Sequence, residues 1–358
     1  EVNYEFLSNA PLKSQNAFYE HVKSWIQGKT PAYLFVDEVQ ELESWAQTIN
    51  SVRAEFDINI YITGSNSRMF IGEHLTYLSG RYVSIEVYPL SFLEYRDFKR
   101  IQNFEGGQVA SVSAPGGIEG LYDNYVTEGS FPAVVLAPDK NLAQTILEGL
   151  YDSVFNRDII QRGGIRNVEV FQKLALFVLE NIGNQTSAYA IANALKSAGH
   201  SISVDTVDSY LTLMGNAYLL YRCYRYDIRG KERLKTNGKY YVVDPGLRNH
   251  VIGQVGSNRG RVTENMVFLE LRRRGYDVAI GTINRTEIDF IAQRQSERCY
   301  VQVSETVLDP EVLARELAPF AQIKEVYPQM LITKDRTNYS TQGIKHVNLY
   351  DFLLGKKL

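Results

Sequence analysis

Two continuous apolar runs that end in polar side chains limit the fold of this chain more than any other feature. Residues 32–39 read AYLFVDEV, and residues 58–65 read INIYITGS. An apolar run without polar alternation is typical of a parallel strand that is buried on both faces. Amphipathic stretches at 14–28 and 41–56 predict helices before and between the two runs. Strands that alternate with helices predict a doubly wound, parallel α/β sheet.

The pattern then changes several times along the chain. A helix at 68–78 and a third strand at 82–90 complete the first sheet, and three further helices are predicted at 91–104, 121–128 and 141–161. Three more helices precede two strands, at 170–183, 186–199, 203–220, 221–228 and 239–246. Three helices and a hairpin are the pattern of a winged helix-turn-helix. From residue 263 onward, helices at 263–275 and 309–323 alternate with strands at 277–283, 287–293, 299–306 and 327–333. This alternation predicts a second, smaller α/β domain.

Composition excludes several classes of protein. A chain of 358 residues is longer than one hydrophobic core usually accommodates, so several domains are expected. No apolar run approaches the length of about 20 residues that spans a bilayer, and no signal-peptide pattern is present, so we expect a cytoplasmic protein without a membrane partner. Cys223 and Cys299 are the only cysteines and the five histidines are scattered, which argues against a disulfide framework or a zinc site.

Charge is unevenly distributed although the net charge is only −3. The segment 222–274 holds 13 Lys or Arg and 5 Asp or Glu, and the rest of the chain carries the compensating acidic excess. Such segregation is expected of a surface that binds a polyanion. A solvated basic face without a ligand explains the same pattern equally well.

Two adjacent acids, Asp37 and Glu38, follow the first apolar run. Ligands of open α/β sheets bind at the carboxyl ends of the strands, and this is the Walker B pattern of P-loop ATPases. Asp37 is predicted to hold the Mg²⁺ ion, and Glu38 is predicted to polarise the attacking water. A strand that simply ends in a solvated acidic loop is the alternative.

The second apolar run ends in small polar side chains, at the place where such an ATPase keeps a polar sensor of the γ-phosphate. Ser65 is therefore a candidate for nucleotide binding and Asn66 for catalysis. Arg81, in the segment SGR, is a candidate arginine finger that would act on a neighbouring subunit. Helix capping by Ser and Asn, and an ordinary surface arginine, are the alternatives.

Taken in order, LFVDEVQ, ITGSNS, SGR and YPLSFLEY resemble a family of bacterial and archaeal AAA-type ATPases. The segments LYDNYVTEGSFPAVV, FNRDIIQRGGIRN, KYYVVDPGLRNHV and TENMVFLELRRRGYDV extend the resemblance over essentially the whole chain. The resemblance implies an ATPase core at 1–98, a helical lid or linker at 99–165, a winged helix at 166–246 and a PD-(D/E)xK nuclease-like domain at 247–358. It also implies ATP and Mg²⁺ as cofactors.

The chain departs from this family in one respect: it contains no GxxxxGK[ST] phosphate-binding loop. The triplet Gly28-Lys29-Thr30 is not such a loop, because residue 23 is lysine and because the triplet precedes a strand instead of following one. The resemblance aligns NYEFL with the family's second strand, so we expect the loop to lie on residues before Glu1.

The nuclease-like part has lost some of the side chains that its chemistry needs. Glu264 on a helix and Asp289 on a strand match the metal-binding acids, whereas Gln302 replaces an acid and Ser304 replaces the lysine. Strand alternation argues that neither Glu287 nor Glu305 compensates. We therefore expect an inactive nuclease fold.

The turn of the predicted hairpin is strongly basic. Its cations are candidates for phosphate contacts with nucleic acid, namely Arg229, Lys231, Arg233 and Lys235. A winged helix that only joins protein domains is the alternative.

The sequence thus predicts an enzyme that hydrolyses ATP to reposition a winged-helix and nuclease-like module on DNA, with a homo-oligomer if Arg81 acts in trans. A DNA-binding protein with a degenerate ATPase scaffold and a metal-dependent nuclease are the alternatives.

Overall fold

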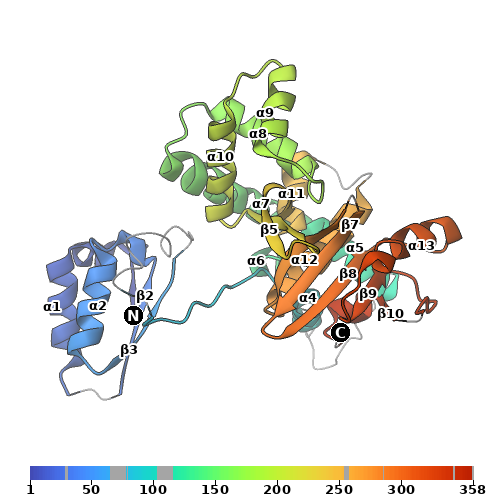
Figure 1. Cartoon of the computed structure of the whole chain (residues 1–358). Helices are drawn as coiled ribbons and strands as arrows, with labels where there is room; N and C mark the ends of the chain where they lie inside the picture. The colour runs from blue at the N-terminus through green and yellow to red at the C-terminus, as the bar shows by residue number, and fades with distance from the viewer. Residues whose placement is uncertain are drawn as a thin grey trace. The chain divides into compact units, whose positions relative to one another are not determined.

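The computed structural model describes residues 1–28, 31–64, 78, 80–102, 116–253, 258–284, 286–341 and 343–356. These residues form a mixed α/β protein of two compact units (Figure 1). The first unit consists of Glu1–Glu86 together with Asn216–Tyr218, and the second consists of Val87–Gly215 and Leu219–Leu358.

A three-stranded parallel sheet forms the centre of the first unit. Its strands lie in the order β1 (Val2–Asn3), β2 (Ala32–Asp37) and β3 (Ile58–Ile62). The helices α1 (Gln15–Ile26) and α2 (Trp45–Glu55) share one hydrophobic core with this sheet. Short 3₁₀ helices cover Leu7–Lys13 and Val39–Glu41. The predicted strands at 32–39 and 58–65 and the helices at 14–28 and 41–56 are therefore confirmed.

Only one face of this sheet is buried within the described residues. Leu34 and Val36 lie in the core with α1 and α2, whereas Tyr33, Phe35 and Tyr61 are each about half exposed. Phe35 and Tyr61 stack on each other, with their ring centroids 5.0 Å apart. The apolar run had suggested burial on both faces, but both helices pack on the same face, so the other stays open.

The predicted third strand at 82–90 is wrong. Residues 82–88 are irregular, and Val83, Ile85 and Val87 are each at least 80% exposed. Alternating apolar residues favour a strand only where a neighbouring strand supplies hydrogen bonds and a core supplies burial, and this segment has neither among the described residues. The helix expected at 68–78 lies outside the described residues, apart from Leu78.

Helices make up the start of the second unit. They are α4 (Phe92–Gln102), α5 (Gly117–Glu128), α6 (Pro132–Val135), α7 (Lys140–Asp152) and a π-helix (Ser153–Gln161). The helices predicted at 121–128 and 141–161 are confirmed, except that the second changes from α to π geometry at Ser153. Wide turns of this kind are rare inside helices.

Three helices and a hairpin follow in the predicted order (Figure 1). They are α8 (Val168–Glu180), α9 (Ala188–Ser197), α10 (Val204–Asn216), β4 (Leu220–Asp227) and β5 (Glu232–Val242). The side chain of Ser187 accepts a hydrogen bond from the Ala190 N–H, and Ser203 accepts one from the Thr206 N–H. Both serines thus cap the first turn of a helix. The helix α11 (Pro245–Ile252) was not predicted.

The hairpin belongs to a larger sheet and is not an isolated wing. Seven strands lie in the order β10-β9-β8-β7-β6-β4-β5. β6 (Asp277–Ile283) pairs with β4 in parallel. The next two strands, β7 (Thr286–Arg294) and β8 (Glu297–Val303), pair with each other antiparallel. The last two, β9 (Gln329–Thr333) and β10 (Ile344–Asn348), run parallel to β8. The sequence predicted β6 to β9 but neither β10 nor the junction of β4 with β6.

Helices cover both faces of this sheet. The long helix α12 (Arg259–Arg273), together with α14 (Leu349–Leu353), α4 and α5, shares the main core with one face. On the other face, a second cluster packs around Ile288 and Tyr300. It includes Leu317, which ends α13 (Pro310–Leu317), and Phe320, in a short 3₁₀ helix at Phe320–Gln322. The helices α4 and α5 therefore share one hydrophobic core with the seven-stranded sheet.

The buried carboxylate of Asp244 joins distant parts of the second unit. Its Oδ2 accepts hydrogen bonds from the N–H and the hydroxyl of Ser130, both at 2.7 Å, and its Oδ1 accepts one from the Leu247 N–H at 2.9 Å. Beside it the backbones of Gly129 and Gly246 touch: a Cβ on Gly246 would lie 2.6 Å from the Cα of Gly129. The segments EGSFP and VDPG thus lock α5 to α11.

Replacing Gly246 with alanine tests this junction. The added Cβ would lie 2.3 Å from the Glu128 carbonyl oxygen, and backbone atoms cannot yield as a side chain can. We expect the free energy of unfolding to fall by about 1–3 kcal/mol. In the control Gly149→Ala, the new Cβ on α7 meets nothing within 4 Å, so we expect a gain of about 0.5–1 kcal/mol. Equal effects of both substitutions in urea unfolding would contradict the close approach.

Candidate functional site

The carboxyl edge of the three-stranded sheet brings together polar side chains from all three strands. Asp37 ends β2, and its Oδ2 accepts a hydrogen bond from the Asn3 amide at 2.9 Å. The hydroxyl of Thr63, the residue after β3, donates to Asp37 Oδ1. Asn3 and Thr63 were not singled out from the sequence, although each stands at the end of a strand, as Asp37 does.

Glu38 adopts an unusual backbone conformation beside this group. Its φ is 55°, in the left-handed region that residues other than glycine rarely enter. The Glu38 N–H donates to Thr63 Oγ1 at 3.3 Å, the Val39 N–H donates to the Thr63 carbonyl at 3.0 Å, and the Gln40 amide contacts the Glu38 carboxylate. Strain of about 1–3 kcal/mol of this kind is concentrated at functional sites.

The donor set of this edge fits a magnesium ion. Mg²⁺ prefers oxygen ligands and retains several waters, and Asp37 and Thr63 offer such oxygens. Asn3 turns its amide nitrogen toward Asp37, and its oxygen accepts a hydrogen bond from the Glu5 N–H. Within the described residues, however, no group of three or more His, Cys, Asp or Glu side chains is arranged to hold a metal ion by itself. The remaining ligands would have to be water and nucleotide.

Of the other residues predicted to contact the nucleotide, only Arg81 lies within the described part of the chain. Ser65 and Asn66 lie outside the described residues. Arg81 is exposed, and its N–H donates to the Leu78 carbonyl at 2.9 Å. The structure thus places Asp37 and Glu38 beside Thr63. The roles of Ser65, Asn66 and Arg81 stay predictions.

The predicted nuclease-type acids surround a lysine that the sequence analysis missed. Lys239, on β5, is buried and lies 2.7 Å from Glu264 Oε1, 2.6 Å from Glu287 Oε1 and 3.7 Å from Asp289 Oδ1. We call these four residues the Lys239 cluster. Glu287, which strand alternation had set aside, lies two residues from Asp289 on β7 and therefore on the same face of the strand.

Only one of the remaining residues considered for the nuclease site, Gln302, forms a described hydrogen bond to the Lys239 cluster. Gln302 Oε1 accepts a hydrogen bond from the Asp289 N–H at 3.2 Å, and its amide donates to Glu316 at 3.1 Å. The Ser304 hydroxyl donates to the Thr306 carbonyl at 3.1 Å. Glu305 forms an ion pair with Lys334 at 2.9 Å. Gln302 thus borders the Lys239 cluster, whereas the described bonds of Ser304 and Glu305 lead elsewhere.

Burial and charge shift the proton equilibria in the Lys239 cluster. Burial, with the neighbouring Glu264 carboxylate, raises the pKa of Asp289 to about 8. Burial alone would lower the pKa of Lys239, but Glu264, Asp289 and Glu287 together raise it above its ordinary value. The lysine therefore stays charged and Asp289 stays protonated at neutral pH.

The basic hairpin turn is exposed in part. Arg229 and Lys231 are exposed, and Lys231 has a φ of 54°. Arg233 forms an ion pair with Asp277. The side chain of Lys235 lies outside the described part of the chain. Three of the four predicted cations are thus exposed, and one of these three, Arg233, is already paired with a carboxylate.

Much of the basic excess of segment 222–274 is used inside the second unit. Lys239 lies in its cluster, Arg248 donates to the Leu179 carbonyl at 2.8 Å, and Arg274 pairs with Glu270 at 2.7 Å. Arg273 donates to the Pro89 carbonyl at 3.0 Å. The charge count of this segment therefore overstates the basic surface available to a polyanion.

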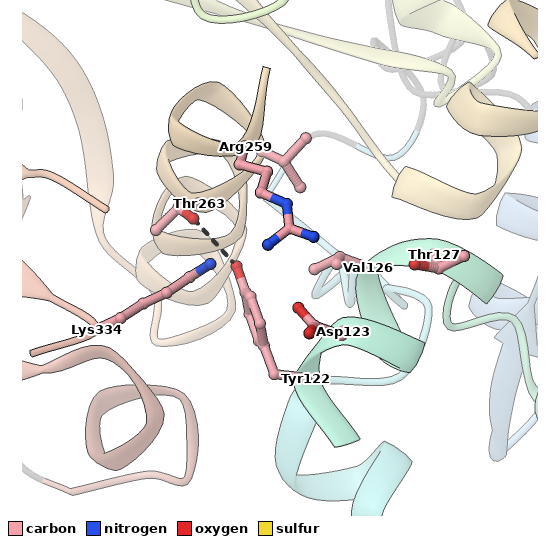
Figure 2. Close-up of a pocket in the computed structure, with 8 residues that line it drawn as sticks. Tyr122, Asp123, Val126, Thr127, Arg259, Thr263 and Lys334 are labelled. Atoms are coloured by element: carbon pink, nitrogen blue, oxygen red, sulfur yellow. Dashed lines mark hydrogen bonds between the residues drawn. The ribbon is translucent and has the colours of Figure 1, made fainter. Parts of the chain in front are cut away.

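A small cavity of about 90 Å³ lies between α5 and α12. Figure 2 shows Arg259 and Lys334 pointing toward Tyr122, whose hydroxyl lies 3.4 Å from Thr263 Oγ1. Asp123 also lines the cavity, and Lys334 is paired with Glu305. The positive charges here are thus partly neutralised within the unit itself.

None of the helices in the described part of the chain has the length and apolarity needed to cross a membrane.

Comparison with known proteins adds two family matches and two relatives. Residues 2–96 match a family described as an AAA domain, and residues 119–258 match a family described as a domain of unknown function, DUF8612. An uncharacterized protein of Haemophilus influenzae is 38% identical over 98% of this chain and 89% of its own length. An uncharacterized protein of Methanocaldococcus jannaschii is 30% identical over 97% of this chain and 77% of its own length. The AAA match includes the acidic end of β2.

The raised pKa of Asp289 predicts a specific pH dependence. Above its ordinary pKa of 3.8, Asp289 is ionised in the unfolded chain but keeps its proton in the folded chain up to about pH 8. The folded state then binds more protons, so this residue makes the free energy of unfolding fall as pH rises from about 4 to about 8. Asp289→Asn should flatten that dependence in urea unfolding, because asparagine does not titrate.

The exposed Asp205 on α10 provides the matched control. Asp205→Asn should leave the slope of stability against pH as it is in the wild type. Identical slopes for Asp289→Asn and the wild type would show that Asp289 is ionised in the folded protein at neutral pH.

Proposed function

We propose a function for this chain from its membership of a family: it belongs to the same family as the uncharacterized proteins of Haemophilus influenzae and Methanocaldococcus jannaschii, and its residues 2–96 match an AAA domain. Its first unit binds ATP with Mg²⁺ and hydrolyses it. The observation that carries this proposal is the group at the carboxyl edge of the sheet, where Asp37 and the strained Glu38 lie beside Thr63.

Each residue of this edge has a distinct role in the proposal. Asp37 holds the Mg²⁺ ion, directly or through water, and Thr63 and Asn3 orient its carboxylate by hydrogen bonds. Glu38 orients the attacking water, and its left-handed backbone directs its side chain away from the regular path of β2. When bound, Mg²⁺ neutralises charge on the phosphates. Ser65 and Asn66 sense the γ-phosphate, and Arg81 acts on a neighbouring copy in a homo-oligomer.

ATP binding also needs a phosphate-binding loop, and the 358 residues contain no GxxxxGK[ST] pattern. The test therefore uses the natural gene product, and its intact mass is first compared with 40.7 kDa. A strand, loop and helix would add about 30 residues. A mass of 40.7 kDa without ATP turnover would refute the proposal.

Glu38→Gln tests the catalytic assignment. The amide cannot accept a proton from the attacking water, so we expect ATP turnover to fall by about 10²–10⁴-fold while nucleotide binding persists. Steady-state phosphate release and binding of a fluorescent ATP analogue measure the two effects. In the control Glu55→Gln, the substituted residue ends α2 and leads to the amino end of β3, so turnover should not change. Unchanged turnover in Glu38→Gln would remove Glu38 from the mechanism.

We further propose that ATP hydrolysis repositions the rest of the protein on DNA, with 99–165 as a lid or linker, 166–246 as a winged helix and 247–358 as a nuclease-like domain. The exposed Arg229 and Lys231 at the hairpin turn favour this second function. α10, which would be the recognition helix, exposes Asp205 and Asp208, so phosphate contacts fall to the turn.

The double variant Arg229→Gln/Lys231→Gln tests DNA binding. Loss of two phosphate contacts should weaken duplex binding and lower the salt dependence of log K by about 1 per contact. Fluorescence anisotropy of a labelled duplex between 50 and 200 mM salt measures both quantities. The matched control Lys140→Gln/Lys345→Gln removes two exposed charges elsewhere and should bind as the wild type does. Equal losses in both double variants would indicate a purely non-specific charge effect.

A further inference from the structure

We propose that the ammonium group of Lys239 takes the place of a divalent cation among the nuclease-type acids, so that this site is a closed internal ion cluster and does not bind a metal. The proposal is independent of ATP hydrolysis, because all of its residues belong to the second unit.

One cation already lies at the centre of the carboxylates. The Lys239 ammonium is within 2.7 Å of Glu264 and Glu287, and 3.7 Å from Asp289. These acids come from α12 and β7, whereas the lysine comes from β5. A nuclease lysine assists the water beside a metal, but this ammonium sits between the acids that would hold the metal. A divalent ion there would meet strong repulsion at contact distance.

Each of the three carboxylates also has a partner besides the lysine. The Val303 N–H donates to Asp289 Oδ2 at 2.8 Å and the Gln185 amide contacts Glu287 Oε2, so these bonds hold oxygens that do not face the lysine. The Tyr241 hydroxyl donates to Glu264 Oε1, the oxygen that also pairs with the lysine. Mg²⁺ demands near-octahedral oxygen ligands with little distortion. For carboxylates that are each held by a separate donor, adopting that geometry has a cost in hydrogen bonds, which adds to the repulsion between the metal ion and the ammonium group.

The backbone fixes Lys239 in this position. The neighbouring Gly238 exchanges two hydrogen bonds with Thr186, at 2.8 and 3.0 Å, and a Cβ on Gly238 would lie 2.7 Å from the Cys223 carbonyl oxygen. The Gly183 N–H also donates to the Tyr240 carbonyl at 3.0 Å. The residues before and after the lysine are therefore both fixed by backbone hydrogen bonds, and the lysine side chain is only 5% exposed.

The cluster fastens separate segments to one another. Its ion pairs join β5 to α12 and β7, and Gln185 adds the loop before α9. Next to it, the Asn265 side chain exchanges hydrogen bonds of 2.8 and 2.9 Å with the backbone of Val242. The arrangement that would cleave DNA in a nuclease thus holds the hairpin to the C-terminal sheet.

Titration with Mn²⁺ alone, followed by the electron paramagnetic resonance signal of the free ion, tests the proposal. Wild type and Asp289→Asn should bind Mn²⁺ equally. Lys239→Met keeps the length of the side chain but removes its charge, so it should gain one site that binds at least tenfold more tightly than any site of the wild type. The double variant Lys239→Met/Asp289→Asn should lose that site again. Lys345→Met, which removes an exposed lysine on β10, should match the wild type.

Two results would overturn the proposal. The first is Mn²⁺ binding by the wild type that weakens in Asp289→Asn, since the lysine would then leave room for a metal. The second is a folded Lys239→Met variant, judged by its circular dichroism melting curve, that gains no site. If Lys239→Met does not fold, the comparison of wild type with Asp289→Asn decides: equal binding supports the proposal and unequal binding refutes it.

Discussion

A fully buried carboxylate must have its oxygens hydrogen-bonded, and Asp244 obtains its donors from Ser130, 114 positions away, and from Leu247 at the start of α11. Burial raises its pKa, and the hydrogen bonds from Leu247 and Ser130 oppose that rise. Because Gly129 and Gly246 allow the two backbones to touch, the carboxylate can reach both segments. α5, α11 and the carboxyl end of the hairpin are thus held together at one carboxylate.

Much of the fold was predictable because local signals and burial agree. Ser187 and Ser203 cap helices whose apolar faces are regular, and the strands at 277–283 and 287–293 carry clear apolar runs. The failure at 82–90 has the opposite cause: Val83, Ile85 and Val87 alternate well, but the described structure gives them no strand to pair with. The junction of β4 with β6 was missed because strand order is a long-range property that no single segment encodes.

The candidate sites show the same division. Asp37 and Glu38 were predictable because the acids follow directly on an apolar strand, whereas Thr63 became visible only once β3 lay beside β2. Lys239 was counted as part of a basic surface, since charge counts do not distinguish a buried lysine from an exposed one. The carboxylate of Glu264, 2.7 Å from the lysine, is 25 positions away on another element. Only the tertiary structure shows that the charge of Lys239 is neutralised by carboxylates of the same unit.

The parallel pairing of β4 with β6 has a consequence for synthesis on the ribosome. Cys223 on β4 bonds to the carbonyl of Val278 on β6, 55 positions later in the chain. At about 5–20 residues per second, β6 follows β4 by about 3–11 seconds. Once β5 has been made up to Val242, the hairpin is complete for the rest of that interval, but one edge of β4 exposes unpaired backbone groups, and such edges recruit strands from other chains. Newly made chains therefore pass through a stage at which a chaperone, or a slower rate of translation, would decide between folding and aggregation.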